Sequence, residues 1–436
     1  MSVQWFGELP ERWELHRLKF FYKEVDYRSQ TGNEEMLSVS HITGITPRSQ
    51  KNVTMFMSES NVGLKICQPD DIVVNTMWAW MAALGVSAFH GIISPSYGVY
   101  RPINNMYNPK YLNYLLRTEE YRTEYVRRST GIRSSRLRLY PDQFLDTRVI
   151  LPPRDEQDQI VRYLDWKVSE INWLIAKKHM QHINLTLYRI KMNNDLMNKV
   201  NGEYARFKNV FSLRKGLSIT KEDLRNEGVP CVNYGEIHSK FGFEINADDV
   251  KELKCVDEKF LLNYPNALLK YGDFVIADTS EDIKCSGAFT YLNNHTKTFA
   301  GYHTIIASAK IPINHRFVAY YFDSEPYRLQ IWRSVNGVKV YSITQSILNN
   351  TLIKFPSEEE QNEIVSILDK KGEKIERISN TFLKEAELLK EYRTRFISDV
   401  VTGKLNVRGM VVPEYEAVED VAVDEEAEEE IEMEDE

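Results

Sequence analysis

One arrangement of acidic residues in the sequence could support catalysis. Asp273 and Asp278 precede Asp282-Ile283-Lys284, and an acid followed by an acid-x-Lys element is typical of metal-dependent nucleases, in which carboxylates bind the metal ion. The spacing is short, and Asp273 has a counterpart, Asp71, that no acid-x-Lys element follows. A structural role in a repeated fold explains Asp273 better than catalysis does, so a nuclease is only the alternative hypothesis.

Other catalytic signatures are absent from the sequence. It has no Gly-x-x-x-x-Gly-Lys loop for phosphate and no His-Glu-x-x-His pair for zinc. The Asn-Pro-Pro-aromatic motif of adenine methyltransferases is also missing, since only Asn108-Pro109-Lys110 comes near it. The cysteines are far apart and form no Cys-x-x-Cys pair, which indicates reduced thiols rather than a metal site: Cys67, Cys231, Cys255 and Cys285. We predict no catalytic residue, metal or cofactor in this chain.

Two basic segments are better candidates for function. Sequence-specific DNA binding needs cationic side chains for phosphates and polar side chains for base edges. The first segment has five arginines in twelve residues, and its predicted DNA-binding residues are Arg127, Arg128, Ser129, Thr130, Arg133, Ser134, Ser135, Arg136 and Arg138. The second supplies Arg333, Asn336, Lys339, Tyr341 and Ser342. A solvated surface loop could explain either segment alone, but not as readily two at equivalent places.

A further possible base-contacting surface is Met77-Trp78-Ala79-Trp80 together with Ser94-Pro95-Ser96-Tyr97, although paired tryptophans more often belong to a core.

The overall charge is compatible with a DNA partner. The net charge of -8 arises in residues 409–436, which contain 14 acidic and no basic residues. Residues 1–408 carry 49 acidic against 55 basic residues, a net charge of +6.

The chain contains an internal duplication. Residues 151–161 and 355–365 share a Pro-containing, acidic Glu-Gln pattern at an offset of 204, which pairs Glu156-Gln157 with Glu360-Gln361. Upstream, an offset of 206 pairs Tyr114 with Tyr320, so the repeat includes the region before each pattern. The chain is therefore predicted to be two units of about 200 residues, each a globular domain followed by a helix.

Both helices are predicted to be long, because each pattern is followed by apolar residues at steps of three, four or seven. Such stripes require partners, and we expect the two to bury each other as an antiparallel coiled coil. The residues predicted to pack are Ile160, Leu164, Ile171, Ile175 and Leu187 in the first helix, and Ile364, Leu368, Ile375, Phe382 and Leu389 in the second.

The predicted fold is α/β (α+β), because the globular regions mix β-branched runs with short helices. The predicted boundaries are 1–151 and 203–355 for the globular domains, 152–202 and 356–408 for the helices, and 409–436 for a disordered acidic tail.

No apolar run is long enough to span a membrane, and the first residues do not resemble a signal peptide. We expect a cytoplasmic chain without a membrane partner.

With these residues in view, the chain resembles the specificity subunit of a type I restriction-modification enzyme. The duplicated Glu-Gln helix start and the glycine-containing basic loop before it carry the resemblance, together with Val400-Val401-Thr402-Gly403-Lys404-Leu405. The resemblance implies two target recognition domains that read the halves of a bipartite, asymmetric double-stranded DNA site, separated by antiparallel spacer helices. It also implies two modification subunits, which use S-adenosylmethionine to methylate adenine, and restriction subunits, which use ATP and magnesium.

Besides the nuclease, a second alternative is a scaffold whose helices and domains bind only proteins. Salt dependence distinguishes it from a DNA reader, because each phosphate contact adds about one unit to the log-log slope of affinity against salt.

Changing Arg133 and Arg136 to Ala should weaken DNA binding by the assembled complex and lower that slope by about one to two units, because two phosphate contacts would be lost. Fluorescence anisotropy at several salt concentrations measures both quantities. Unchanged affinity and slope would argue against the loop assignment.

Overall fold

The computed structural model describes residues 9–50, 60–131, 137–246, 253–337 and 339–418. The chain forms two compact units. Unit 1 comprises residues 1–181 and 381–436, and unit 2 comprises residues 182–380. Each long helix is therefore divided between the units. In the described part of the chain, no helix is both long enough and apolar enough to cross a membrane.

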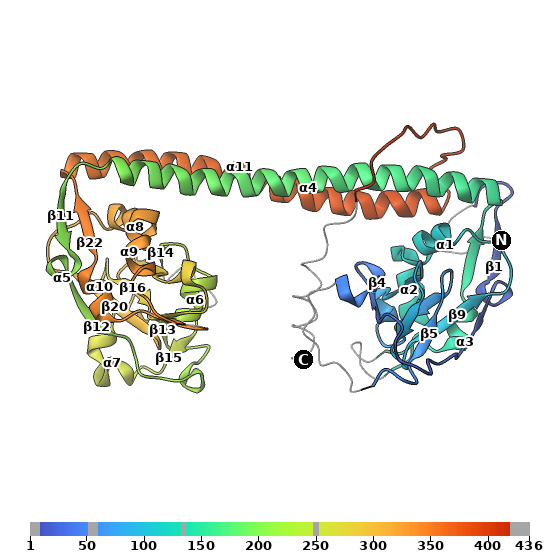
Figure 1. Cartoon of the computed structure of the whole chain (residues 1–436), viewed down its shortest axis with the longest axis horizontal. Helices are drawn as coiled ribbons and strands as arrows, with labels where there is room; N and C mark the ends of the chain where they lie inside the picture. The colour runs from blue at the N-terminus through green and yellow to red at the C-terminus, as the bar shows by residue number, and fades with distance from the viewer. Residues whose placement is uncertain (1–8, 51–59, 132–136, 247–252, 338, 419–436) are drawn as a thin grey trace. The chain divides into compact units, whose positions relative to one another are not determined.

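Unit 1 is built around a four-stranded antiparallel sheet (Figure 1). The strand order is β2 (Tyr22–Glu24), β9 (Gly98–Pro102), β6 (Ile72–Val74) and β7 (Leu84–Val86). Three two-stranded pairs accompany it: β1 (Glu14–Arg17) with β10 (Arg148–Leu151), β3 (Leu37–Ser40) with β4 (Gly44–Pro47), and β5 (Lys65–Cys67) with β8 (Gly91–Ile93). The helices are α1 (Pro109–Leu116), α2 (Glu119–Arg128) and α3 (Pro141–Leu145), with short 3₁₀ turns η1 (Leu18–Phe20), η2 (Arg48–Gln50) and η3 (Ala79–Met81).

Unit 2 has a five-stranded sheet in the order β12 (Phe211–Lys215), β20 (Thr304–Ala309), β16 (Phe274–Ala277), β18 (Phe289–Leu292) and β14 (Glu244–Ile245). Smaller sheets are β15 (Cys255–Val256), β13 (Val229–Val232) and β19 (Phe299–Ala300); β11 (Glu203–Arg206) and β22 (Leu352–Phe355); and β17 (Thr279–Ser280) and β21 (Tyr341–Ser342). Its short helices are α5 (Phe207–Val210), α6 (Tyr234–Ser239), α7 (Phe260–Asn263), α8 (His315–Asp323), α9 (Glu325–Trp332) and α10 (Gln345–Asn350), and its 3₁₀ turns are η5 (Lys221–Asp223), η6 (Pro265–Ala267) and η7 (Ile283–Cys285).

The predicted duplication is visible in the strand pairing. In unit 1, β1 pairs antiparallel with β10 immediately before a long helix, and in unit 2, β11 pairs in the same way with β22. The central pairs β6 with β9 and β16 with β20 also correspond. Asp71 and Asp273, which precede the two central strands, each accept a backbone N–H three residues upstream and bind an arginine. These contacts confirm the structural interpretation of Asp273.

The two long helices are α4 (Arg154–Lys199) and α11 (Glu358–Val401). Acidic residues occupy the first turn of each, where they stabilise the positive end of the helix dipole. Within unit 1, Asn172 bonds to Arg393 and Lys178 pairs with Glu385, so α4 and α11 are antiparallel. Within unit 2, His182 contacts Ser379 and Asn201 bonds to Glu360, so the two helices are antiparallel there as well.

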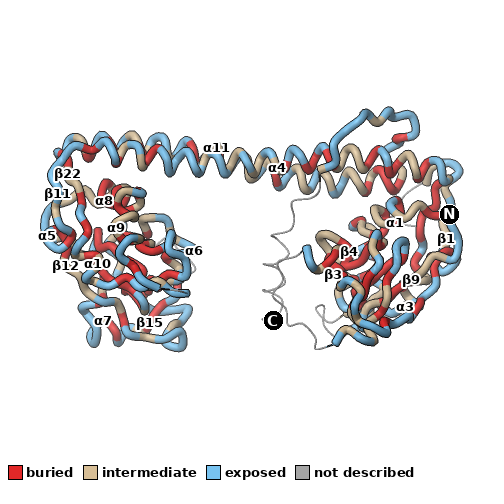
Figure 2. Tube along the Cα trace, in the orientation of Figure 1, coloured by how far each residue is buried: buried red, intermediate tan, exposed pale blue. Residues whose placement is uncertain are grey.

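Most of the predicted packing residues are buried, but only Ile171 and Ile175 of α4 pack mainly against α11, at Ala386 and Leu389. The other buried members belong to the cores of the globular domains, Ile160 and Leu164 in unit 1 and Ile364, Leu368 and Ile375 in unit 2. The buried members are Ile160, Leu164, Ile171, Ile175, Ile364, Leu368 and Ile375, and Phe382 and Leu389 are half-buried. Figure 2 shows buried positions recurring along both helices. Burial of a leucine such as Leu164 or Leu368 contributes about 2 kcal/mol.

The prediction for Leu187 is wrong, because its side chain is 56% exposed. Ile183 and Ile190, on the same face of α4, are also about half exposed. The contacts of α4 in unit 2 come instead mainly from another face, where Met192 is buried in the core with the half-buried Leu185 and Leu196. Met197, which is seven residues after Ile190 and shares its face, is buried near the C-terminal end of the helix. Helical period predicts that apolar residues share a face, but it does not say which face the partner covers.

Repeated polar contacts attach each globular domain to its long helix. The hydroxyl of Tyr114 donates to Asp165 at 2.9 Å, and the hydroxyl of Tyr320 donates to Asp369 at 2.6 Å. Lys110 pairs with Asp165 as Arg316 pairs with Asp369. Burial, followed by the neighbouring carboxylate, raises the pKa of both tyrosines, so their hydroxyls remain protonated donors at neutral pH.

The repeated Glu-Gln pattern has a structural function at the helix starts. The buried Gln157 side chain donates to the Pro152 carbonyl oxygen at 2.9 Å, and Gln361 donates to the Pro356 carbonyl oxygen at 3.1 Å. Each glutamine thereby ties the first turn of the helix to the end of the preceding strand. The pattern therefore marks a junction that is repeated in both copies and requires no catalytic explanation.

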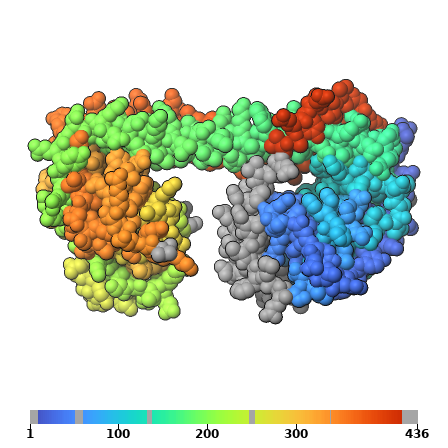
Figure 3. All heavy atoms as spheres, viewed as in Figure 1, coloured from blue at the N-terminus to red at the C-terminus, as the bar shows by residue number. Residues whose placement is uncertain are grey.

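The first ten residues of the predicted tail lie along α4 in unit 1 (Figure 3). Ser169 accepts the N–H of Val418 at 2.8 Å and donates to the Glu416 carbonyl oxygen at 3.0 Å. Gln159 donates to the Met410 carbonyl oxygen at 2.7 Å. The tail thus begins as a segment bound to α4, while residues 419–436 lie outside the described part of the chain.

Candidate nucleic-acid interface

Three segments of unit 1 meet beyond one end of the central sheet. Thr76, which follows β6 by two residues, accepts the N–H of Leu139 on its carbonyl oxygen at 2.9 Å. Its hydroxyl donates to the Ser96 carbonyl oxygen at 3.0 Å. Asn75 also donates to the Tyr97 hydroxyl at 3.3 Å. The structure therefore brings residues 77–80, residues 94–97 and the end of the first basic loop together.

The first basic loop is closed at its base. Thr130 and Arg138 form an antiparallel bridge with N···O distances of 3.0 and 2.9 Å, and both residues are exposed. Leu139 is fully buried next to the bridge, which fixes where the loop returns to the core. Four of the predicted DNA-binding residues lie outside the described residues: Arg133, Ser134, Ser135 and Arg136.

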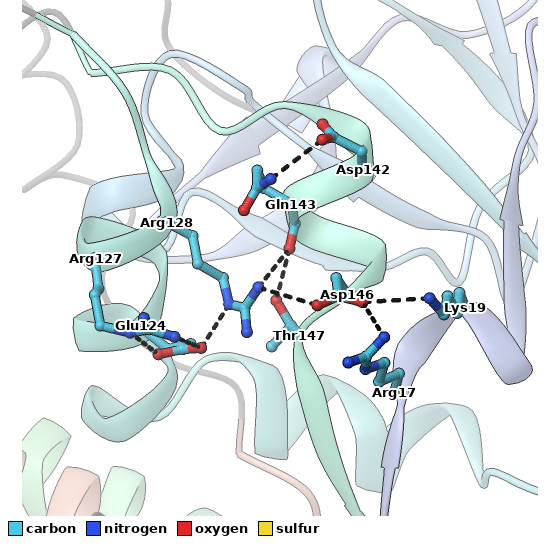
Figure 4. Close-up of polar contacts among 9 residues, drawn as sticks. All are labelled: Arg17, Lys19, Glu124, Arg127, Arg128, Asp142, Gln143, Asp146 and Thr147. Carbon is cyan, nitrogen blue, oxygen red and sulfur yellow. Dashed lines mark hydrogen bonds and ion pairs between the residues drawn. The ribbon is translucent and has the colours of Figure 1, made fainter.

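Two predicted DNA-binding arginines belong to an ion-pair cluster at the root of this loop (Figure 4). Glu124, whose side chain is 3% exposed, binds both Arg127 and Arg128. Arg128 is 13% exposed and also lies near Asp146 and the Gln143 carbonyl oxygen. It therefore supports the loop from beneath, and the half-buried Ser129 follows it. Arg127 is 66% exposed and is available at the surface.

The Glu124 carboxylate is kept ionised by these partners. Burial raises the pKa of Glu124, but the hydrogen bonds and charges of Arg127 and Arg128 outweigh burial and place the pKa below its usual value. A carboxylate with a lowered folded-state pKa stabilises the fold above its unfolded pKa and loses that contribution as pH falls through the folded pKa. The cluster is therefore intact at neutral pH.

Three equivalent segments meet in unit 2. Asp278, directly after β16, accepts the N–H of Ile343 on its carbonyl oxygen at 2.8 Å. The N–H of Asp278 donates to the His303 carbonyl oxygen at 3.0 Å. Asp278 thus occupies the place of Thr76, His303 that of Ser96, and Ile343 that of Leu139.

The second basic segment presents its predicted residues at the surface. Arg333, Asn336, Lys339 and Ser342 are exposed, and Tyr341 is half-buried in β21. Val335 is buried in the core between them and anchors the segment. A Cβ at Gly337 would overlap the Val340 carbonyl oxygen, so glycine is required for the backbone to approach this closely.

The three segments of unit 2 line an open groove of about 860 Å³. Its lining includes Lys215, Asp278, Thr279, Tyr302, His303, Ser342 and residues 344–346. Sequence reasoning singled out Asp278 and Ser342 in this set but missed Tyr302 and His303. Neither the charge nor the spacing of these two residues distinguishes them, and only strand pairing brings them next to Asp278.

The acidic residues of the nuclease alternative do not form a metal site. Asp273 binds Arg214 and the N–H of Lys270, Asp278 contacts His303, and Asp282 accepts the N–H of Lys284 at the start of η7. In the described residues, no group of three or more His, Cys, Asp or Glu side chains could hold a metal ion. Each carboxylate instead has a local structural partner.

Comparison with known proteins supports a DNA-recognition role. Residues 199–388, which include the second globular domain, match the family described as Type I restriction modification DNA specificity domain. This part of the chain is similar to a type I restriction-modification DNA specificity domain. It is 24% identical over 425 residues to the type I restriction enzyme MjaVIII specificity subunit of Methanocaldococcus jannaschii, covering 92% of this chain and 95% of that protein. The predicted resemblance to type I specificity subunits is thereby confirmed.

Solved structures agree with this relationship. A chain from the structure titled "Structural basis underlying complex assembly and conformational transition of the type I R-M system" superposes with a TM-score of 0.66 at 15% identity, covering 91% of this chain and all of that one. This likeness shows that the two chains share a fold. The HsdS subunit from Thermoanaerobacter tengcongensis is also 15% identical, with a TM-score of 0.49 over 91% of this chain and 98% of that one. None of these relatives favours the nuclease or the scaffold alternative.

Replacing Glu124 by Gln should lower the free energy of unfolding by about 3 kcal/mol, because Arg128 would keep a buried charge without its carboxylate. Glu119→Gln is the matched control, since Glu119 also pairs with an arginine three residues later on α2 but is 59% exposed; its effect should stay below about 1 kcal/mol. Urea unfolding of the purified chain measures both. If both substitutions lower the free energy of unfolding by the same amount, the buried Glu124 cluster stabilises the fold no more than the exposed Glu119 pair does.

Proposed function

We propose that this specificity chain reads a bipartite, asymmetric double-stranded DNA site for a type I restriction-modification complex. The observation that carries the proposal is the pair of equivalent three-segment surfaces, one in each unit. In both units the carbonyl oxygen after the central strand accepts a backbone N–H, from Leu139 or from Ile343. The side chains at equivalent positions differ, as Thr76 and Asp278 do, and Thr76 uses its hydroxyl to reach Ser96. Two copies of one scaffold with different surface chemistry suit a site whose halves have different sequences.

The basic residues around each surface fit contacts with the phosphate backbone. Arg127 and Arg138 are exposed at the first loop, and Arg333 and Lys339 at the second segment. Contacts of this kind position a protein on DNA, while base contacts select the sequence. The long helices α4 and α11 connect the recognition domains, and we infer that their length sets the gap between the half-sites.

In this proposal, partner subunits catalyse the methylation and the cleavage of DNA. The specificity chain is non-catalytic, and two modification subunits with S-adenosylmethionine methylate adenine, while restriction subunits with ATP and magnesium cleave DNA. Ile183, Leu187 and Ile190 form an exposed apolar face on α4 in unit 2, a suitable contact surface for a partner subunit. We place the assembly in the cytoplasm, where bacterial and archaeal DNA is accessible.

Deleting the gene should remove adenine methylation from one bipartite, asymmetric motif, because no other subunit would direct the modification subunits to that motif. Long-read sequencing of genomic DNA, with and without the gene, scores methylation at every motif. Restoring the gene on a plasmid is the control and should restore the motif. If the partner subunits are active and no motif changes, the proposal is wrong.

Leu187→Glu should prevent co-purification with the modification subunits without lowering the melting temperature of the chain, because a charge would enter a docking face that the isolated chain leaves exposed. Leu187→Met is the control, since it keeps an apolar side chain of similar volume. Size-exclusion chromatography of the mixed subunits checks assembly. Normal assembly of the glutamate variant would exclude this face as the contact.

A further inference from the structure

Asp278 is held in place at the centre of the surface in unit 2. Its N–H donates to His303 in one neighbouring segment, and its carbonyl oxygen accepts from Ile343 in the other. Both backbone groups are thus fixed by segments distant in the sequence. The side chain remains one-third exposed, and Asp278 lines the groove. A carboxylate placed in this way is a rigid hydrogen-bond acceptor that a ligand can reach.

His303 orients this carboxylate. Its ring Nδ1 lies 3.1 Å from Asp278 Oδ1, which leaves Oδ2 for another partner. His303 has a φ of 56°, an uncommon left-handed conformation for a residue other than glycine, and such conformations cluster at functional sites. The ring of Tyr234 packs edge-on against His303 at 5.5 Å and against Tyr302 at 5.6 Å. The backbone conformation and the aromatic packing together hold the imidazole beside the carboxylate.

A carboxylate in a DNA-binding groove cannot contact phosphates, because the like charges repel. Its counterpart must therefore be a hydrogen-bond donor on a base edge. In the major groove, guanine offers two acceptors, and thymine offers an acceptor and a methyl group. Adenine offers an amino donor beside the N7 acceptor, which would face the carboxylate unfavourably. The cytosine N4 amino group has an acceptor, guanine O6, on one side only, whereas the adenine amino group lies between adenine N7 and thymine O4, so cytosine is the base that fits best.

We propose that Asp278 is a specificity-determining residue that reads the N4 amino group of a cytosine in the half-site bound by unit 2. This inference rests on the proposed function. The equivalent residue of unit 1, Thr76, is 8% exposed and uses its hydroxyl on the Ser96 carbonyl oxygen. That position offers no carboxylate to a base. The preference for cytosine at this position therefore belongs to one half of the motif only.

The test compares methylated motifs in a host that expresses the modification subunits with the wild-type chain or with Asp278→Asn. The substitution removes the charge but keeps an oxygen for the contact with His303. Asp282→Asn is the matched control, because it makes the same charge change four residues away on a carboxylate that caps η7 and does not line the groove. Long-read sequencing gives the preferred base at every position of each motif.

We expect Asp278→Asn to reduce the preference for cytosine at one position roughly 10-fold or more, with the other half of the motif unchanged. Asp282→Asn should give the wild-type motif. A wild-type motif without a G·C pair in either half, or an unchanged motif in Asp278→Asn, overturns the inference while the proposed function stands. If both substitutions relax the same position, the effect is one of charge alone and the inference is also overturned.

A second variant decides the case in which Asp278→Asn abolishes methylation. His303→Asn removes the imidazole that orients Asp278, and asparagine tolerates the left-handed conformation. It should weaken the preference at the same single cytosine, and an unchanged motif would overturn the inference. If the wild-type chain directs no methylation with modification subunits that are active with another specificity subunit, the proposed function itself fails, and the inference with it.

Discussion

The hydrogen bonds between each recognition domain and its long helix are the constraint on which the function depends. Tyr114 binds Asp165 in unit 1, and Tyr320 binds Asp369 in unit 2, each supported by a cation at the equivalent position. Both tyrosines are half-buried, so misplacement of a domain would leave polar groups that are partly shielded from water without their partners. Each domain therefore has one defined orientation on its own helix.

From that fixed orientation, the same backbone arrangement produces two different surfaces. The residue after each central strand is tied to the segment before the neighbouring strand and to the buried residue that ends each basic segment, Leu139 or Ile343. Because these ties use mainly backbone atoms, the exposed side chains can change without altering the scaffold. A DNA-reading protein needs this separation, since specificity resides in side chains at base edges and the fold must tolerate their replacement.

Several features could be predicted because they depend on local pattern. The long helices follow from apolar spacing and acidic first turns, and the duplication follows from the repeated Glu-Gln start. The buried stripe from Ile160 to Ile175 was correct, whereas Leu187 was assigned to the wrong environment. Spacing defines a face of a helix, but only the tertiary partner decides whether that face is covered. For the same reason, the charge of Arg128 predicted a DNA contact but could not show that this side chain is bound to the buried Glu124 carboxylate.

The sequence alone determined that the chain is a duplicated, two-domain protein with long helices, basic segments at equivalent places and no recognisable catalytic motif. These properties follow from the periodicity, the composition and the repeat offset, which can be read from neighbouring residues or by comparing one half of the chain with the other. The tertiary structure decided which residues share a surface. Asp278, His303 and Ile343 are separated by 25 and 40 residues along the chain, and hydrogen bonds between segments bring them together. Such pairings depend on the whole fold, because long-range strand register and core packing select them and no local propensity specifies them.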